Sequence, residues 1–92
     1  MTYLFYYTNS LKTLDVTNFD TGNVTNISRM FYKCSLLLKL DITNFNTSKV
    51  TNMSHMFHGC GSIEELDISS FDTTNVTSME TMLAYLYKVN VI

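Results

Sequence analysis

Apolar residues recur along the chain at a fixed interval of 26 residues. Leu14, Leu40 and Leu66 open three segments of similar sequence, and thirteen of the 26 positions are identical between the first two segments. A period of this length is typical of a stacked-repeat architecture. Because one unit cannot bury its own apolar stripe, each apolar position is expected to stack on its equivalent in the next unit. The clearest columns are Leu14/Leu40/Leu66, Val16/Ile42/Ile68, Phe19/Phe45/Phe71, Val24/Val50/Val76 and Ile27/Met53/Met79.

The first part of each unit alternates apolar and polar residues. This pattern covers residues 11–17, 37–43 and 63–69, and it is rich in Leu, Ile and Val. Alternation over a few such residues predicts short β-strands. Since the units run head to tail, the equivalent strands should pair as a parallel sheet.

The second part of each unit carries a helical spacing. From Val24 to Phe31 the apolar residues recur at intervals of 3, 3 and 1, which places them on one face of a helix. Helices are therefore predicted over residues 25–33, 51–59 and 77–87. Each has a threonine at its N-cap position (Thr25, Thr51 and Thr77). Gly59 and Gly61 stand where the second helix should end.

Together these elements predict an α/β fold. The expected architecture is a right-handed, leucine-rich-repeat-like solenoid of about three 26-residue strand–turn–helix units with a parallel sheet. Residues 1–92 form one repeat domain, with a partial unit at 1–13 and units at 14–39, 40–65 and 66–92. Met1 and Phe5 stand 26 residues before Ile27 and Phe31, and Ile92 stands 26 after Leu66. The chain thus starts and stops within a unit, and we expect it to be a segment of a longer array.

The phenylalanine column should fill the corner between the sheet and the second part of each unit. Phe19, Phe45 and Phe71 each follow a predicted strand by two residues and precede a polar turn. Phe45 has neighbours in the column on both sides. Its replacement by alanine is therefore expected to cost the most stability of the three.

Composition narrows the classes of function. The net charge is −2 and the hydrophobic content 46%, so the chain should fold, and no basic excess points to nucleic acid or to an anionic membrane. The first twelve residues have neither the basic region nor the apolar run of a signal peptide. No catalytic set, phosphate-binding loop or cofactor motif occurs. We expect no enzyme, no cofactor, no metal and no membrane insertion by this segment.

Two cysteines and two histidines are candidates for specific chemistry. Cys34 and Cys60 share a repeat position, so they should lie on adjacent units, close enough for a disulfide by backbone distance. A pair of buried thiols is the favoured alternative. His55 and His58 have a spacing that zinc sites use, but they occur only in the second unit. Solvent-exposed variable positions are the favoured interpretation for both.

A column of aspartates is the candidate site for a partner. Asp15, Asp41 and Asp67 fall on the exposed side of the predicted sheet, beside Thr17, Thr43 and Ser69. Like charges on neighbouring strands repel one another, so three in register need compensation. Hydrogen bonds from the backbone or from hydroxyl groups are the favoured source. Lysine and arginine of a protein partner, or a bound Ca²⁺, are the alternatives.

Two units carry a specific sequence resemblance. LDVTNFDTGNVTNISRMFYKCSLL and LDITNFNTSKVTNMSHMFHGCGSI resemble the repeat of the BspA-like leucine-rich-repeat surface proteins, in the spacing NFDT…VTNMS…MF..C. Such repeats occur in mycoplasma lipoproteins, other host-associated bacteria and some protists. The third unit departs from the pattern, because it lacks the cysteine and the turn that follows it.

The resemblance implies a non-enzymatic module on the cell surface or in a secreted parent protein. Its expected role is adhesion through binding to host or neighbouring-cell proteins. A structural spacer or a remnant fragment with no ligand of its own is the alternative. Because a short stack leaves both ends of its core open, association of chains end to end is also expected.

Overall fold

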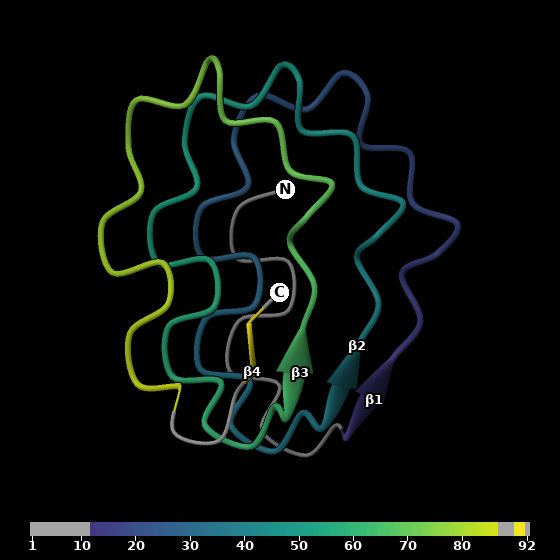
Figure 1. Cartoon of the computed structure of the whole chain (residues 1–92), viewed down its shortest axis with the longest axis vertical. Coiled ribbons are helices and arrows are strands. Elements are labelled where there is room, and N and C mark those ends of the chain that lie inside the picture. The colour runs from purple at the N-terminus through teal and green to yellow at the C-terminus, as the bar shows by residue number, and fades with distance from the viewer. Residues whose placement is uncertain (1–11, 87–89, 92) are drawn as a thin grey trace.

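The computed structural model describes residues 12–86 and 90–91. Within them lie four strands of two residues each: β1 (Thr13–Leu14), β2 (Lys39–Leu40), β3 (Glu65–Leu66) and β4 (Asn90–Val91). β1 pairs with β2, and β3 pairs with β4, both in parallel. Figure 1 shows β1, β2 and β3 side by side along one edge of the molecule. The predicted parallel strands are therefore confirmed in place, although each is much shorter than expected.

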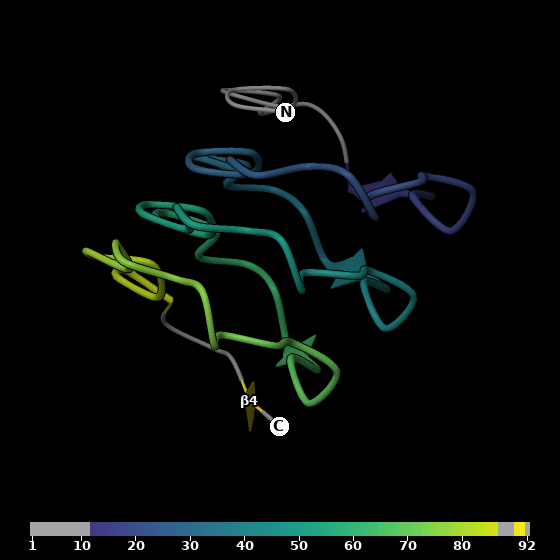
Figure 2. The same cartoon turned by 90° about the horizontal axis from the view of Figure 1, so that it is seen from above.

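Successive units lie one above another, as Figure 2 shows in the view from above. The register of β1 and β2 sets Leu14 opposite Leu40, which is the interval of 26 expected from the sequence. At β3 and β4 the register changes by one residue, because Leu66 lies opposite Val91. The expectation that Ile92 would take this place is wrong, since the third unit contains one residue fewer between its strand and the next. Of the partial unit expected at residues 1–13, residues 1–11 lie outside the described residues.

The predicted helices are wrong, because the described residues contain no helix. In their place the second part of each unit is a run of turns whose amides bond to the next unit. The Phe31 amide donates to the carbonyl oxygen of Met56 at 3.0 Å, and the Phe57 amide donates to that of Met82 at 3.0 Å. A helix would have directed these amides to carbonyls four residues earlier in the chain. The backbone hydrogen bonds thus run between units.

Two left-handed residues in each unit produce these turns. The Met30 amide donates to the Ile27 carbonyl, and Arg29 between them has a φ of 55°. A left-handed residue at the third position is the mark of a type II turn. Within residues 12–86 the same conformation recurs at both positions of the three units: Arg29, His55 and Thr81, then Lys33, Gly59 and Tyr85. A positive φ cannot belong to a right-handed helix, so the apolar spacing of 3, 3 and 1 arises here from consecutive turns.

The threonines that were expected to cap helices instead join the units. The Thr51 amide donates to the Thr25 carbonyl at 2.7 Å, and the Thr77 amide donates to the Thr51 carbonyl at 2.8 Å. The hydroxyl groups of Thr51 and Thr77 donate to the same carbonyls, each at 3.2 Å. Beside them Asn26 bridges to Asn52, and Asn52 bridges to Ser78, in parallel. These residues therefore act as sites of pairing between units.

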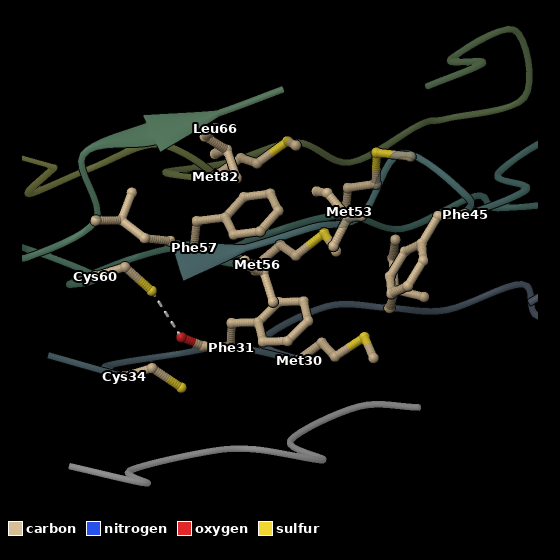
Figure 3. Packing of buried hydrophobic residues seen from close by; sticks show 14 of the residues in the cluster. Met30, Phe31, Cys34, Phe45, Met53, Met56, Phe57, Cys60, Leu66 and Met82 are labelled. Atoms are coloured by element: carbon tan, nitrogen blue, oxygen red, sulfur yellow. Dashed lines mark hydrogen bonds between the residues drawn. The ribbon is translucent and has the colours of Figure 1, made fainter. Parts of the chain in front are cut away.

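The core lies inside the stack, between the strands and the turns, and it is built from the repeated apolar columns (Figure 3). The rings of Phe31 and Phe57 are stacked at 5.6 Å with an interplanar angle of 3°. Phe45 is buried, whereas Phe19 and Phe71 are half-buried. The expectation that Phe45 is part of the core is confirmed, and of the three only Phe45 has a described unit on both sides.

Candidate functional site

The aspartate column is held by hydrogen bonds within each unit. Oδ1 of Asp15 accepts the Thr17 amide at 3.1 Å and the Thr17 hydroxyl at 2.6 Å. Asp41 has the same two contacts with Thr43, at 3.0 and 2.6 Å. In the third unit Asp67 accepts the amide and hydroxyl of Ser69, at 2.9 and 2.5 Å. A tight turn after each strand, with the hydroxyl two residues after the carboxylate, creates this geometry three times.

These contacts lower the pKa of all three carboxyls. For Asp15 the hydroxyl of Thr17 is the main cause and its amide the second, because both hydrogen bonds stabilise the ionised form. The pKa values of Asp41 and Asp67 are lowered in the same way, by the hydroxyl and amide of Thr43 and of Ser69. The charge of the preceding aspartate acts in the opposite direction and raises each pKa in part. Neighbouring carboxylates of the column thus repel one another electrostatically. They form a strip of ionised carboxylates on the surface at neutral pH.

Of the three sources of compensation considered for the column, hydrogen bonding is the one observed. It uses only one oxygen of each carboxylate: within residues 12–86 and 90–91, Oδ2 of Asp15, Asp41 and Asp67 accepts no hydrogen bond. The Oδ2 atoms can therefore accept from a cationic partner. No group of three or more metal-ligating side chains occurs in the described part of the chain.

A hollow of about 380 Å³ opens beside the strip. It is lined by Leu38, Lys39, Leu40, Asp41, Glu64 and Glu65, which belong to β2, β3 and the residues next to them. Asp41 lies in both the strip and the hollow, so the two form one continuous surface. Sequence reasoning singled out the aspartates but missed Lys39, Glu64 and Glu65, which occupy no conserved repeat column. We call the strip and the hollow together the acidic face.

His55 and His58 lie in a column of aromatic rings. The expectation that both would be solvent-exposed is wrong. Both are half-buried. The His58 ring stacks on Tyr32 at 4.9 Å and meets the Tyr85 ring edge-on, also at 4.9 Å. Burial is the main cause that lowers the pKa of His58, followed by the charges of His55, Lys33 and Arg29. His55 hydrogen-bonds to Thr81 through Nδ1. Stacking of equivalent positions accounts for both histidines.

Cys34 and Cys60 are buried and free, as the favoured interpretation expected. The Cys60 thiol donates to the Phe31 carbonyl oxygen at 3.0 Å, the contact drawn in Figure 3. A hydrogen bond with Cys34, followed by burial, raises the pKa of Cys60. A thiol that stays protonated is a poor nucleophile and a poor metal ligand. The pair belongs to the core.

Comparison with known proteins places the chain in a family. A family model described as "Mycoplasma protein of unknown function, DUF285" matches residues 1–91. The chain belongs to this family. No curated protein and no solved structure matches it. No helix able to cross a membrane occurs among the residues described.

Proposed function

We propose that this DUF285 chain is a non-enzymatic module that binds another protein through its acidic face. The proposal includes display on the cell surface, or secretion, as part of a longer parent protein of the BspA-like kind. It also includes the finer architecture, a right-handed solenoid that continues in the parent. The parallel pairing of β1 with β2 and the interval of 26 support that architecture.

The observation that carries the proposal is the pre-organisation of the three aspartates. Each carboxylate is fixed by two hydrogen bonds to Oδ1, so ordering it on binding costs little conformational entropy. The strip also adjoins the carboxylates of Glu64 and Glu65, and among the described residues that line the hollow Lys39 is the one basic side chain. A surface that is this acidic and this rigid suits a protein partner rich in lysine and arginine. Such complementarity favours specificity and fast association.

Binding to a panel of purified extracellular-matrix proteins tests the proposal. The variant Asp15→Asn/Asp41→Asn/Asp67→Asn keeps the Oδ1 acceptors, removes the three charges and replaces each Oδ2 acceptor with an amide NH2 group. It should lower the affinity for a bound matrix protein by roughly tenfold or more, and raised salt should do the same to the wild type. The matched control is Asp20→Asn/Asp72→Asn/Glu80→Gln, which removes equal charge away from the acidic face. Asn46 already stands at the position of Asp20 and Asp72 in the second unit.

The alternative is a structural spacer with no ligand of its own. A spacer would bind no member of the panel. In a second contrary outcome, a matrix protein is bound but the two triple variants lose affinity for it to the same extent. Either result would overturn the proposal. Retained binding by the control together with loss by the aspartate variant supports it.

A further inference from the structure

The turns of the first two units carry a cluster of positive side chains, across the stack from the strands and the acidic face (Figures 1 and 2). Arg29 and Lys33 occupy the two left-handed positions of the first unit, at φ of 55° and 57°. His55 and His58 follow in the second unit. The charges of His55, Lys33 and Arg29 all act on the His58 ring and lower its pKa. We call these four side chains the basic face.

Contacts between units hold the basic face in place. The Tyr32 ring stacks on His58 at 4.9 Å with an interplanar angle of 22°, and the Tyr85 ring meets His58 edge-on. Nζ of Lys33 lies 5.4 Å from the centroid of the Tyr32 ring, within the range of a cation–π contact. A Cβ added to Gly59 would lie 3.1 Å from Cγ of Lys33, so the stem of this lysine packs against the next unit.

The His58 ring presents a hydrogen-bond donor on this face. Its Nδ1 is buried and has no hydrogen-bond partner among the described residues, which leaves Nε2 as the nitrogen that reaches the surface. Buried N–H groups without an acceptor are rarer than unpaired acceptors, so we assign the proton of the neutral ring to Nε2. Nε2 then donates outward whether the ring is neutral or charged. Arginine and lysine side chains are also donors only.

We propose that the basic face binds the sulfate groups of a polyanionic glycan. Its donors lie on two successive units, so the matching ligand carries several acceptor groups along its length. Sulfate oxygens accept charge-assisted hydrogen bonds from such donors. A metal ion does not fit the same place, because the charges of Arg29 and Lys33 repel a cation beside His55 and His58.

Two features favour a glycan over other polyanions. Single-stranded nucleic acid binds by stacking its bases on aromatic faces, but Tyr32 and His58 cover one face of each other. An extended peptide pairs with available backbone groups. Here the amides of Arg29 and Lys33 already donate to carbonyl oxygens of the second unit. Side-chain donors remain, and these suit the sulfates and hydroxyls of a sugar chain.

Heparin fragments, as a sulfated glycan, provide the probe for a calorimetric test. Arg29→Gln/Lys33→Gln should weaken heparin binding by roughly tenfold or more, because each substitution removes a charge-assisted hydrogen bond. The matched control is Lys12→Gln/Lys49→Gln, which removes equal charge at exposed positions outside the basic face. Its affinity should change by less than about twofold. Circular dichroism melting verifies that both double variants are folded.

NMR titration of the His58 ring in the wild type tests the location of the site without any substitution. A sulfate bound beside the ring stabilises its protonated form and opposes the effect of Arg29, Lys33 and His55. The pKa of His58 should therefore rise when heparin is added. Desulfated heparin of the same length should leave it unchanged.

Three results would overturn the proposal. The first is a wild-type chain that does not bind heparin, or that binds it while the pKa of His58 stays the same. The second is an equal loss of affinity in the two double variants. In the third, single-stranded DNA of matching charge binds as tightly as heparin and raises the pKa of His58 equally, which would assign the basic face to nucleic acid.

Discussion

The hydroxyl of Thr47 pairs with the backbone of Asp72 in the next unit, as a backbone amide and carbonyl would in a strand. It donates to the Asp72 carbonyl oxygen at 3.1 Å and accepts the Asp72 amide at 2.7 Å. Thr21 makes the same pair of contacts with Asn46, at 3.2 and 2.8 Å. Both threonines are buried. One side chain thus satisfies the amide and the carbonyl of one residue in the next unit, at a turn where the strands have ended.

Thr47→Val should destabilise the protein by about 1–3 kcal/mol, because valine keeps the shape but leaves a partly buried amide and carbonyl unpaired. Chemical denaturation measures the loss. Thr73→Val is the control, since Thr73 is exposed and its hydroxyl makes no hydrogen bond to another described residue. Its effect should stay within about 0.5 kcal/mol. Equal losses in the two variants would contradict the role of the buried hydroxyl.

Gly59→Ala should cost about 1–2 kcal/mol, because Gly59 has a φ of 80° and a side chain disfavours this conformation. An added Cβ would also lie 3.1 Å from Cγ of Lys33. At Gly22 an added Cβ meets nothing closer than Oδ1 of Asp20 at 3.4 Å, and the backbone is not left-handed. Gly22→Ala should therefore change the free energy of unfolding by less than about 0.5 kcal/mol. A stable Gly59→Ala protein would count against the left-handed turn.

Phe45→Ala should cost about 3–5 kcal/mol through lost burial and an unfilled cavity. Phe71→Ala should cost clearly less, because Phe71 is half-buried in the third unit. Thermal melting of both variants measures the difference. Should the two lose the same stability, or Phe45→Ala melt like the wild type, the stacking of Phe45 between two neighbours would be wrong.

The sequence predicted the register of the stack but not the conformation of half of each unit. Leu14 and Leu40 pair as their spacing requires, because a repeated apolar column must stack on itself. Helices were inferred from the spacing of Ile27, Met30 and Phe31, which consecutive turns produce equally well. The distinction between a helix and consecutive turns depends on residues with a positive φ. Among those residues only Gly59 is of a type that favours a positive φ. Arg29 and Tyr85 adopt the same conformation without any such signal.

At the acidic face, the 26-residue repeat predicted both the aspartates and the hydroxyl groups that hydrogen-bond to them. Asp15 and Thr17 recur together in each unit, and a carboxylate followed two residues later by a hydroxyl indicates a local turn. Contacts between units were harder to foresee. The buried hydroxyl of Thr47 looks like any other turn residue in the sequence, because its partner lies 25 residues away.

His58→Tyr should make stability less dependent on pH between 7 and 5. The pKa of His58 is lowered in the folded state, chiefly by burial, from an ordinary value of 6.5. The unfolded chain therefore takes up a proton that the folded chain resists, and stability falls as pH falls through 6.5. Tyrosine already occupies the equivalent position as Tyr32, so stacking on the neighbouring rings is preserved.

Melting temperatures of the wild type and His58→Tyr across this range provide the measurement. The pKa values of Asp15, Asp41 and Asp67 are lowered from their ordinary value of 3.8, so these three carboxyls do not contribute in this window. The wild-type melting temperature should fall towards pH 5, while that of His58→Tyr should stay nearly level. Two parallel profiles would contradict the lowered pKa.

The most direct test of the stacked arrangement is the hydrogen-bond partner of the Phe31 amide. Scalar coupling across hydrogen bonds, measured by NMR on the labelled chain, identifies the acceptor carbonyl of each amide. The structure predicts a coupling from the Phe31 nitrogen to the carbonyl carbon of Met56, across a bond of 3.0 Å. A coupling from Phe31 to the carbonyl of Ile27, four residues earlier, would show a helix and contradict the account.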